Sequence, residues 1–275
     1  MMMVSVIIPT YNRAWIIKEA IDSVLTQTHK AYELIVVNDG SIDNTDSILN
    51  QYDKKLRVIR QANRGVSAAR NQGIASSSGD LIALLDSDDL WLPEKLERQV
   101  SFFQDHPQAL ICQTEEIWIR NGKRVNPGRR HQKPSGMIFE PSLSLCLVSP
   151  SAVMFRKELI DRVGLFDENL PACEDYDMWL RVGSRYPVYL IDQPLIVKRG
   201  GHADQLSRSP MLDKYRIEAI RKLLYQNLLT RKQRQAAMAK LKEKCGIYAA
   251  GCKKRGRHQE AEAYIQLVDS LGTHQ

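Results

Sequence analysis

The stretch GDLIALLDSDD, residues 79–89, decides the fold. Its middle, residues 81–85, is a short and fully apolar run, which is typical of a strand buried on both faces of a parallel sheet. Two carboxylates, Asp86 and Asp88, follow where the apolar run stops. The stretch therefore predicts a buried strand with acidic side chains at its carboxyl end.

The chain before this stretch repeats a pattern of strand, polar turn and helix. Strands are predicted at residues 4–9, 32–37 and 56–60, and helices at 15–25, 44–52 and 66–75. Strands that alternate with helices imply an α/β fold with a mainly parallel, Rossmann-like sheet and helices on both faces. Ligands bind beyond the carboxyl ends of such strands. We therefore expect PTYNR (9–13), NDGS (38–41) and DSDD (86–89) along one rim.

The later part of the chain is less regular. A helix is predicted to end near residue 104, followed by strands at 110–120, 151–155 and 188–190 and helices at 157–163 and 175–184. The segment 121–134 is basic and contains Gly and Pro, which predicts a mobile loop. Three helices are predicted at 212–229, 231–245 and 258–270, and the last two resemble one tetratricopeptide-like hairpin.

The composition limits which classes of protein this chain can belong to. With 275 residues, 43% hydrophobic and 26% charged, the chain suits one sizeable domain plus a smaller element. The five cysteines lack the spacing of a zinc site or a disulfide framework. No apolar run approaches the roughly 18 residues of a membrane-spanning helix, and the first apolar residues are too few for a signal peptide. We expect a cytoplasmic protein with reduced thiols.

Basic residues are concentrated at the end of the chain. From Met211 onward there are 14 Lys or Arg against 6 Asp or Glu. Such a tail is compatible with peripheral contact with anionic lipid at the inner face of a membrane, and solvated helix faces are the commoner explanation. Aromatic and basic residues are not interleaved, so no nucleic-acid partner is expected. An oligomer is compatible with the sequence.

The triplet Asp86-Ser87-Asp88 indicates a metal site. Mg²⁺ and Mn²⁺ prefer carboxylate oxygens, and a nucleotide diphosphate completes their coordination shell. An acidic turn before the next helix is the simpler explanation of such a triplet on its own. The two other polar strand ends expected on the same rim favour the metal-bridged diphosphate.

Four segments, in order, resemble the family 2 glycosyltransferases of the GT-A fold. They are VSVIIPTYNR (4–13), ELIVVNDGSIDNT (33–45), ANRGVSAARNQGI (62–74) and GDLIALLDSDD (79–89). With the acidic cluster near Glu174 and GGHADQLS (200–207), the resemblance covers roughly residues 3–207. It implies a glycosyltransferase domain at 1–207, with a donor-binding half at about 1–105 and an acceptor half at about 106–207. Residues 208–275 would form a basic α-helical C-terminal extension.

The resemblance also implies roles for single residues. The donor nucleotide would be bound by Pro9, Thr10, Tyr11, Arg13, Asp39, Arg70, Asp86 and Ser87. Asp39 would read the base or ribose, Asp88 would hold Mn²⁺ or Mg²⁺, and His202 would approach the metal or diphosphate. Simpler explanations exist for several of them: Tyr11 and Asp39 as turn residues, Arg70 as the partner of a core carboxylate, and His202 as an exposed loop residue.

The segment PACEDYDMWLR, residues 171–181, resembles the second acidic motif of the family. There the second member of the Glu-Asp pair is the catalytic base, which is Asp175 in this chain, and Glu174 would touch the acceptor or tune that base. The alternative is that Glu174, Asp175 and Asp177 merely complement a helix dipole. The Gln-x-x-Arg-Trp motif of processive members is absent, so transfer of a single sugar is expected.

The expected function is therefore metal-dependent, inverting transfer of one sugar from a nucleotide-diphosphate sugar, with UDP favoured. The acceptor would be a hydroxyl of a glycan, a lipid-linked saccharide or a small molecule. Segment 121–134 would line the acceptor pocket and order when the donor binds. Two alternatives stay open: a nucleotidyltransferase of the same fold, and a catalytically idle adaptor that acts through the basic tail.

Overall fold

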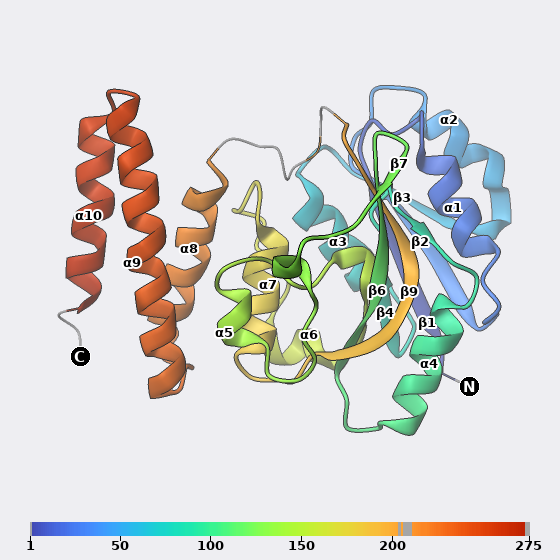
Figure 1. The fold of residues 1–275 in the computed structure, drawn as a ribbon. Helices are drawn as coiled ribbons and strands as arrows, with labels where there is room; N and C mark the ends of the chain where they lie inside the picture. Colours follow the sequence, from blue (N-terminus) through green and yellow to red (C-terminus); the bar gives the residue numbers. More distant parts are fainter. Residues whose placement is uncertain (1, 203–204, 206–210, 273–275) are drawn as a thin grey trace.

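A nine-stranded sheet runs through the protein, and the computed structural model describes residues 2–202, 205 and 211–272. The strand order is β3-β2-β1-β4-β8-β6-β9-β5, and β7 pairs with β6 outside this path. Helices cover both faces of the sheet, and three further helices stand beside it at the carboxyl-terminal end (Figure 1). The predicted α/β class with a helical extension is confirmed.

Four strands that are all parallel to one another lie in the amino-terminal half. They are β1 (Val4–Thr10), β2 (Tyr32–Asn38), β3 (Arg57–Arg60) and β4 (Leu81–Leu84). All seven residues of β1 are buried, because it lies between β2 and β4 with a helical layer on each face. The register pairs Thr10 with Asn38 and Asn38 with Arg60, so these strands end at one edge.

Helices on the two faces of the sheet pack against different residues of the same strands. The first face is covered by α1 (Ile17–Leu25), α2 (Thr45–Leu49) and α4 (Lys95–Asp105), with the 3₁₀ turn η1 (Asn50–Lys55) after α2. The second is covered by α3 (Val66–Ala75), α6 (Glu158–Val163) and α7 (Glu174–Gly183). Helix α3 approaches β1 at Gly73, where an added Cβ would lie 2.4 Å from Ile7 Cγ2.

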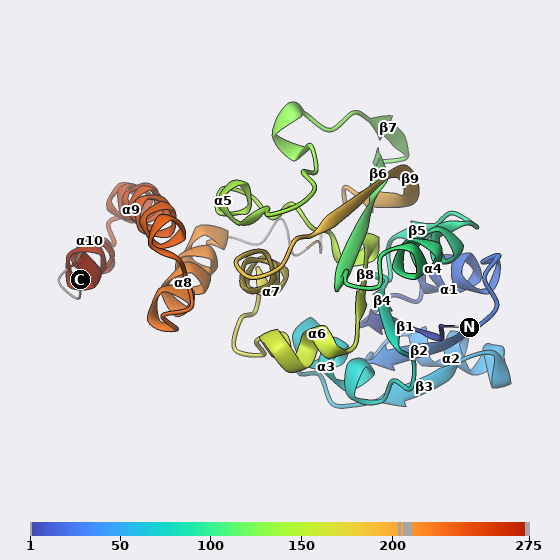
Figure 2. The ribbon, with the colours of Figure 1, turned by 90° about the horizontal axis from the view of Figure 1, so that it is seen from below.

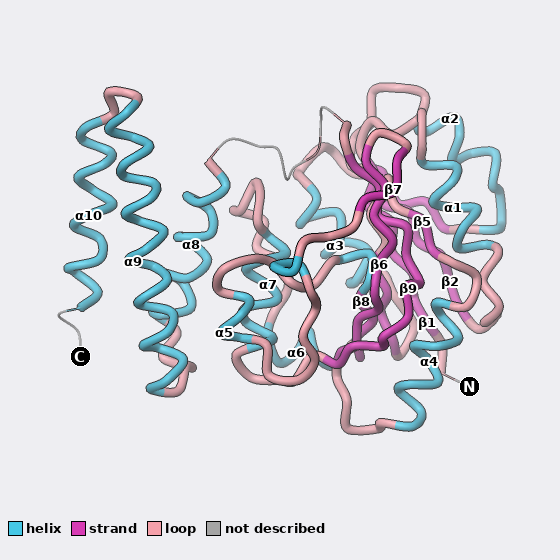
Figure 3. The backbone as a smooth tube through the Cα atoms, in the orientation of Figure 1, coloured by secondary structure: helices cyan, strands magenta, loops and turns pink. Residues whose placement is uncertain are grey.

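The second half of the sheet mixes strand directions. Its strands are β5 (Leu90–Trp91), β6 (Ile111–Arg120), β7 (Lys123–Val125), β8 (Val153–Arg156) and β9 (Tyr189–Gly200). Strand β8 is antiparallel to β4 and β6, whereas β6 and β9 are parallel. Figure 3 shows β6, β8 and β9 crossing the centre of the molecule between the helices. The short elements η2 (Arg129–His131), α5 (Phe139–Ser142) and η3 (Pro150–Ala152) connect these strands.

Two sequence-based predictions in this half were wrong. The last strand was predicted at residues 188–190, but β9 continues to Gly200. Segment 121–134 was predicted to be a mobile loop, but it contains β7 and η2, and Lys133 is buried in an ion pair with Glu116. Segment 121–134 thus contains more regular structure than its basic, Gly- and Pro-containing sequence suggests.

The C-terminal helices are α8 (Leu212–Tyr225), α9 (Arg231–Lys254) and α10 (His258–Gly272). Helix α9 is longer than predicted, begins with a capping box of Thr230 and Gln233, and pairs with α10 as a hairpin (Figure 1). Helix α8 packs on α7 and shares an apolar cluster with α5 and α7. The predicted domain boundary at 207/208 falls outside the described residues. Within the described part of the chain, no helix has the length and apolar character needed to cross a membrane.

Candidate functional site

The first two polar turns are joined to each other by hydrogen bonds. Asp39 N donates to Thr10 O at 2.9 Å, and Asn12 N donates to Ser41 Oγ at 2.9 Å. The side-chain oxygen of Asn12 in turn accepts from Ile42 N at 2.9 Å. The expected convergence of the PTYNR and NDGS turns at one edge is therefore confirmed, and it follows from the register of β1 and β2.

The PTYNR turn presents its side chains in different ways. Pro9 and Thr10 are buried at the end of β1, whereas Tyr11 is 42% exposed. The backbone of Arg13 is fixed by a hydrogen bond from its N–H to Thr45 Oγ1 at 2.9 Å, and its positive charge acts on Asp88. Tyr11 is thus exposed at the end of β1, where its contact with a nucleotide stays a prediction, and Arg13 contributes positive charge near the acidic triplet.

Asp39 is occupied by contacts within the protein. Its carboxylate accepts hydrogen bonds from Gln61 Nε2 at 2.7 Å, Arg64 N at 2.9 Å and Gly65 N at 2.8 Å. The next residue, Gly40, has φ +76°, and a Cβ there would lie 2.7 Å from Asn63 N, so only glycine fits this turn. Asp39 therefore holds the segment before α3, and its contact with the nucleotide stays a prediction.

Arg70 joins two acidic residues that are far apart in the sequence. One of its guanidinium nitrogens lies 2.7 Å from Asp86 Oδ1 and another 2.7 Å from Glu174 Oε1, with the Arg70 side chain only 3% exposed. Burial alone would lower the pKa of Arg70, but the two carboxylates raise it. Arg70 therefore pairs with one buried carboxylate, Glu174, and one partly exposed carboxylate, Asp86, and its contact with the donor nucleotide stays a prediction.

Asp88 is the acidic residue of the triplet that faces His202. His202 Nε2 lies 3.4 Å from Asp88 Oδ2. Burial and the neighbouring charge of Asp86 raise the pKa of Asp88, against the opposing effects of Arg13 and His202. The ionised form of a carboxylate that is disfavoured in this way is stabilised by a cation beside it. No group of three or more His, Cys, Asp or Glu side chains that could hold a metal occurs among the described residues.

These donors fit a divalent ion that also binds a diphosphate. Mg²⁺ and Mn²⁺ bound together with a nucleotide commonly take one or two protein carboxylates and several phosphate and water oxygens. Asp88 and His202 would be the protein ligands here, and Ser87, in the middle of the triplet, is buried. Metal dependence itself stays a prediction.

Asp89 was not assigned a role from the sequence, yet it fixes the triplet in place. Its carboxylate accepts from Ser151 Oγ at 2.6 Å and from Arg199 N at 2.8 Å, and Arg199 Nε donates to Asp88 O at 2.6 Å. Burial and Asp88 raise the pKa of Asp89 well above its usual value. Asp89 and Arg199 therefore attach β9 to the turn that carries Asp88.

The acids at the start of α7 have three different environments. Glu174 is 5% exposed and paired with Arg70, and Asp177 is paired with Arg181 and Lys222 at 2.9 and 2.8 Å. Asp175 is partly exposed, and Cys146 Sγ lies 3.5 Å from its Oδ2. Of the three, only Asp175 lacks a basic partner at contact distance within the described structure, which suits a group that must accept a proton.

Lys198 is a further charged residue that sequence reasoning missed. Its ammonium donates to Ser149 Oγ at 3.2 Å. Burial would lower the pKa of Lys198, but the carboxylates of Glu116, Asp89 and Asp86 raise it, with a smaller contribution from Asp175. No signal in the sequence pointed to Lys198, because it lies in the part of β9 that was not predicted to be a strand.

The segment 146–151 connects these groups. Cys146 contacts Asp175, Ser149 contacts Lys198, and Ser151 bonds both Asp89 and the backbone N–H of Asp86. One short stretch before β8 therefore touches the candidate base, the cation and the acidic turn.

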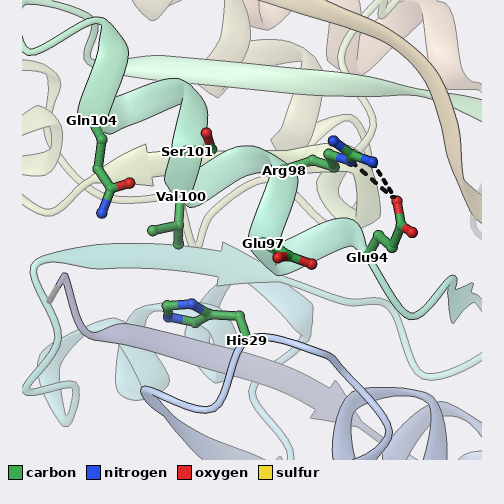
Figure 4. Close-up of a pocket in the computed structure, with 7 residues that line it drawn as sticks. All are labelled: His29, Glu94, Glu97, Arg98, Val100, Ser101 and Gln104. Carbon is green, nitrogen blue, oxygen red and sulfur yellow. Dashed lines mark hydrogen bonds and ion pairs between the residues drawn. The ribbon is translucent and has the colours of Figure 1, made fainter.

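A shallow depression of about 490 Å³ lies elsewhere, between α4 and the chain after α1. Figure 4 shows its lining side chains, with Arg98 paired to Glu94 and His29 facing α4. None of the candidate site residues lines it. We assign the depression no part in the site.

Comparison with known proteins gives the family. Residues 5–164 match the family described as Glycosyl transferase family 2. An uncharacterized glycosyltransferase of Rickettsia typhi is 34% identical over 226 residues, which is 79% of this chain and 70% of that protein. WfgD of Escherichia coli, a UDP-Glc:α-D-GlcNAc-diphosphoundecaprenol β-1,3-glucosyltransferase, is 32% identical over 182 residues, 66% of this chain and 69% of WfgD.

Other relatives are longer than this chain. The match to glycosyltransferases of Rickettsia felis and Rickettsia bellii spans only 35% and 31% of their lengths. In three dimensions, residues 1–349 of S. aureus TarS, crystallised with UDP-GlcNAc, superpose with a TM-score of 0.76 at 21% identity. That superposition covers 98% of this chain and 84% of the TarS 1–349 chain, and it confirms the GT-A fold. The chain belongs to glycosyl transferase family 2.

Proposed function

We propose that this protein is a metal-dependent, inverting glycosyltransferase that moves one sugar from a nucleotide-diphosphate sugar, UDP-type favoured, to a hydroxyl of a glycan or lipid-linked acceptor. The observation that carries the proposal is the bridge that buried Arg70 makes between Asp86 and Glu174, with both contacts at 2.7 Å. It ties the end of β4, which carries Asp88, to the first residue of α7, directly before Asp175. This connection supports a single site in which Asp88 would face a leaving diphosphate and Asp175 would accept the proton.

The proposed reaction is a single displacement. The acceptor oxygen attacks the anomeric carbon, Asp175 takes the hydroxyl proton, and the bond to the diphosphate breaks with its electron pair going to the phosphate oxygen. A bound Mn²⁺ or Mg²⁺ would supply positive charge to the departing diphosphate. Asp88 and His202 would hold that ion, and Arg13 adds positive charge on the same side. Attack from the face opposite the leaving group inverts the anomeric configuration.

Other features support the choice of donor and acceptor. Exposed Tyr11 can stack on a base at the end of β1. WfgD uses a UDP-sugar and a lipid-linked acceptor, and TarS was crystallised with UDP-GlcNAc, so a UDP-sugar and a glycan or lipid-linked acceptor are the first to test. A lipid-linked acceptor would place the enzyme at the inner face of a membrane, which the basic residues after Met211 favour.

A panel of UDP-, GDP- and dTDP-sugars with and without Mn²⁺ tests the proposal. We expect one donor to raise the melting temperature only when the metal is present, and Asp88→Asn to remove that rise. Asp175→Asn should keep the rise and lose transfer, and NMR of the product should show inversion. Exposed Asp192 provides the matched control, since Asp192→Asn changes charge equally outside the site. A metal-independent rise, or full turnover by Asp175→Asn, would refute the respective part of the proposal.

A further inference from the structure

A basic surface around Trp118 lies beside the candidate site. Trp118 is half-buried on β6, and its ring has Arg120 Cζ at 5.5 Å, Lys198 Nζ at 5.8 Å and the His131 ring at 5.0 Å from its centre. Arg130 Nε donates to His131 Nε2 at 3.1 Å. We call Trp118, Arg120, Arg130 and His131 the Trp118 surface.

The carboxylate that touches this surface is already paired. Glu116 accepts from Trp118 Nε1 at 2.9 Å with one oxygen, which fixes the indole, and from Lys133 Nζ at 2.7 Å with the other. Burial lowers the pKa of His131, and Arg130 and Arg120 lower it further. Glu116 is balanced by buried Lys133, so the Trp118 surface carries a net positive charge.

The Trp118 surface is continuous with the site through β9. Trp118 and Lys198 are register partners in the parallel pair β6·β9, and the next residue, Arg199, bonds Asp89 and the carbonyl of Asp88. Lys198 bonds Ser149 in the segment whose Cys146 contacts Asp175. Figure 2 shows the chain from β7 to α5, which carries Arg130 and His131, as an arch that stands out from β6. An acceptor that reaches Asp175 can therefore extend over Trp118.

We propose that the Trp118 surface is an acceptor subsite for a saccharide that bears phosphate, with phosphate oxygens on Arg120 and Arg130 beside the indole. The indole ring of Trp118 holds the cationic groups of Arg120 and Lys198 over it, which concentrates positive charge at this surface. Arginine binds phosphate through paired N–H donors, so it suits a phosphate better than a neutral hydroxyl. This inference rests on the proposed glycosyltransferase function. The phosphate can come from a lipid diphosphate linker or from a polyol-phosphate chain.

Three acceptors test the inference with the full chain and its donor. They are GlcNAc diphosphate esterified to a short alkyl chain, the alkyl GlcNAc glycoside without phosphate, and a glycerol-phosphate oligomer carrying terminal GlcNAc. We expect KM for a phosphate-bearing acceptor to be about tenfold or more below that for the glycoside. The diphosphate and the oligomer distinguish the two sources of phosphate. Binding of each compound is also followed by tryptophan fluorescence, with Trp118→Phe identifying the signal.

Two arginines of the β6–β7 hairpin, Arg120 and Arg124, provide a matched pair of variants. Arg120 shares the Trp118 side of β6, whereas Arg124 pairs with Ile119 and therefore lies on the opposite side. Arg120→Gln should raise KM for the phosphate-bearing acceptor by about tenfold with kcat nearly unchanged, and Arg124→Gln should change neither. Loss of phosphate preference in Arg120→Gln but not in Arg124→Gln supports the subsite.

Two results would overturn the inference. One is equal affinity of the wild-type chain for the phosphate-bearing and phosphate-free acceptors, and the other is an equal effect of Arg120→Gln and Arg124→Gln. Donor binding and slow donor hydrolysis without acceptor are measured in parallel. If no donor binds or is hydrolysed, the proposed function itself fails, whereas intact donor use without phosphate preference removes only the subsite.

Discussion

Replacing Arg70 by methionine should destabilise the protein and make its stability depend strongly on pH. Methionine has a similar length and no charge, so Glu174, 5% exposed, would lose its ion pair at 2.7 Å and remain buried. Breaking a buried ion pair by removing one partner typically costs about 3–5 kcal/mol. Asp86 is more exposed, at 29%, and can be solvated, so most of the cost falls on Glu174.

The pH dependence follows from the protonation of Glu174. Burial raises the pKa of Glu174 in the folded protein, and Arg70 is the main influence that lowers it. Without Arg70 that pKa rises further above the unfolded value near 4.5. The folded variant then binds a proton that the unfolded chain has released, so its stability falls as pH rises from about the unfolded pKa to the folded one. The deficit should be larger at pH 8 than at pH 5.

Urea denaturation at both pH values measures the deficit, with Glu174→Gln and the double variant completing the cycle. Arg70→Met with Glu174→Gln removes both charges, so it should recover most of the stability lost by Arg70→Met alone at pH 8. A deficit below about 1 kcal/mol, or one equal at pH 5 and pH 8, would refute the assignment of Arg70 as the partner of buried Glu174.

Three other predictions concern separate parts of the molecule. Gly73→Ala should lower the free energy of unfolding by about 1–3 kcal/mol, because the added Cβ meets Ile7. Gly246→Ala in α9, which has open space around it, should raise the free energy of unfolding by about 0.5–1 kcal/mol. Urea titration measures both changes, and an increase in stability for Gly73→Ala as well would contradict the close packing of α3 on β1. Lys222→Met should lower stability near pH 7 and flatten its acid dependence. Burial is the largest single influence on the pKa of Asp167 and raises it, but the hydrogen bond and charge of Lys222, together with the hydrogen bonds of Asn169, lower this pKa overall. The contribution of Lys222 is therefore present above the unfolded pKa and is lost on acidification; thermal melts at pH 3–7 with unchanged pH dependence would exclude this pair. Asp175→Asn should lower kcat by about 10²–10⁴ with donor affinity retained, measured by product formation, and a loss of donor binding instead would argue for a structural role.

The placement of the polar strand ends could be predicted because their signals are local. An apolar strand followed directly by Asp86 and Asp88 fixes which side chains reach the edge of the sheet, and the parallel register places the PTYNR and NDGS turns beside each other. Such pairings follow from strand direction alone. The residues at the carboxyl ends of these strands were therefore placed from the sequence, although the hydrogen bonds that Asp39 makes within the protein were not predicted.

The acceptor side depends on contacts between distant residues. Arg70 and Glu174 are 104 positions apart, and Asp89 bonds Arg199 across 110 positions, so no local pattern indicates either contact. The strand β9 was missed beyond residue 190 because Asp192, Gln193 and Pro194 interrupt the apolar pattern. The structure accommodates them by a shift in register, where Thr114 pairs with Ile191 but Glu115 pairs with Pro194.

The packing of α8 on α7 has a consequence for dissecting this chain. Tyr176 and Leu180 of α7 are buried in the same cluster as Ile220 and Leu224 of α8, and Lys222 bonds Asp177, two residues after Asp175. A truncation at residue 207 would uncover the apolar back of the helix that bears Asp175. Engineered chimaeras that exchange the C-terminal helices should therefore keep α8 with the catalytic part and place the junction between α8 and α9.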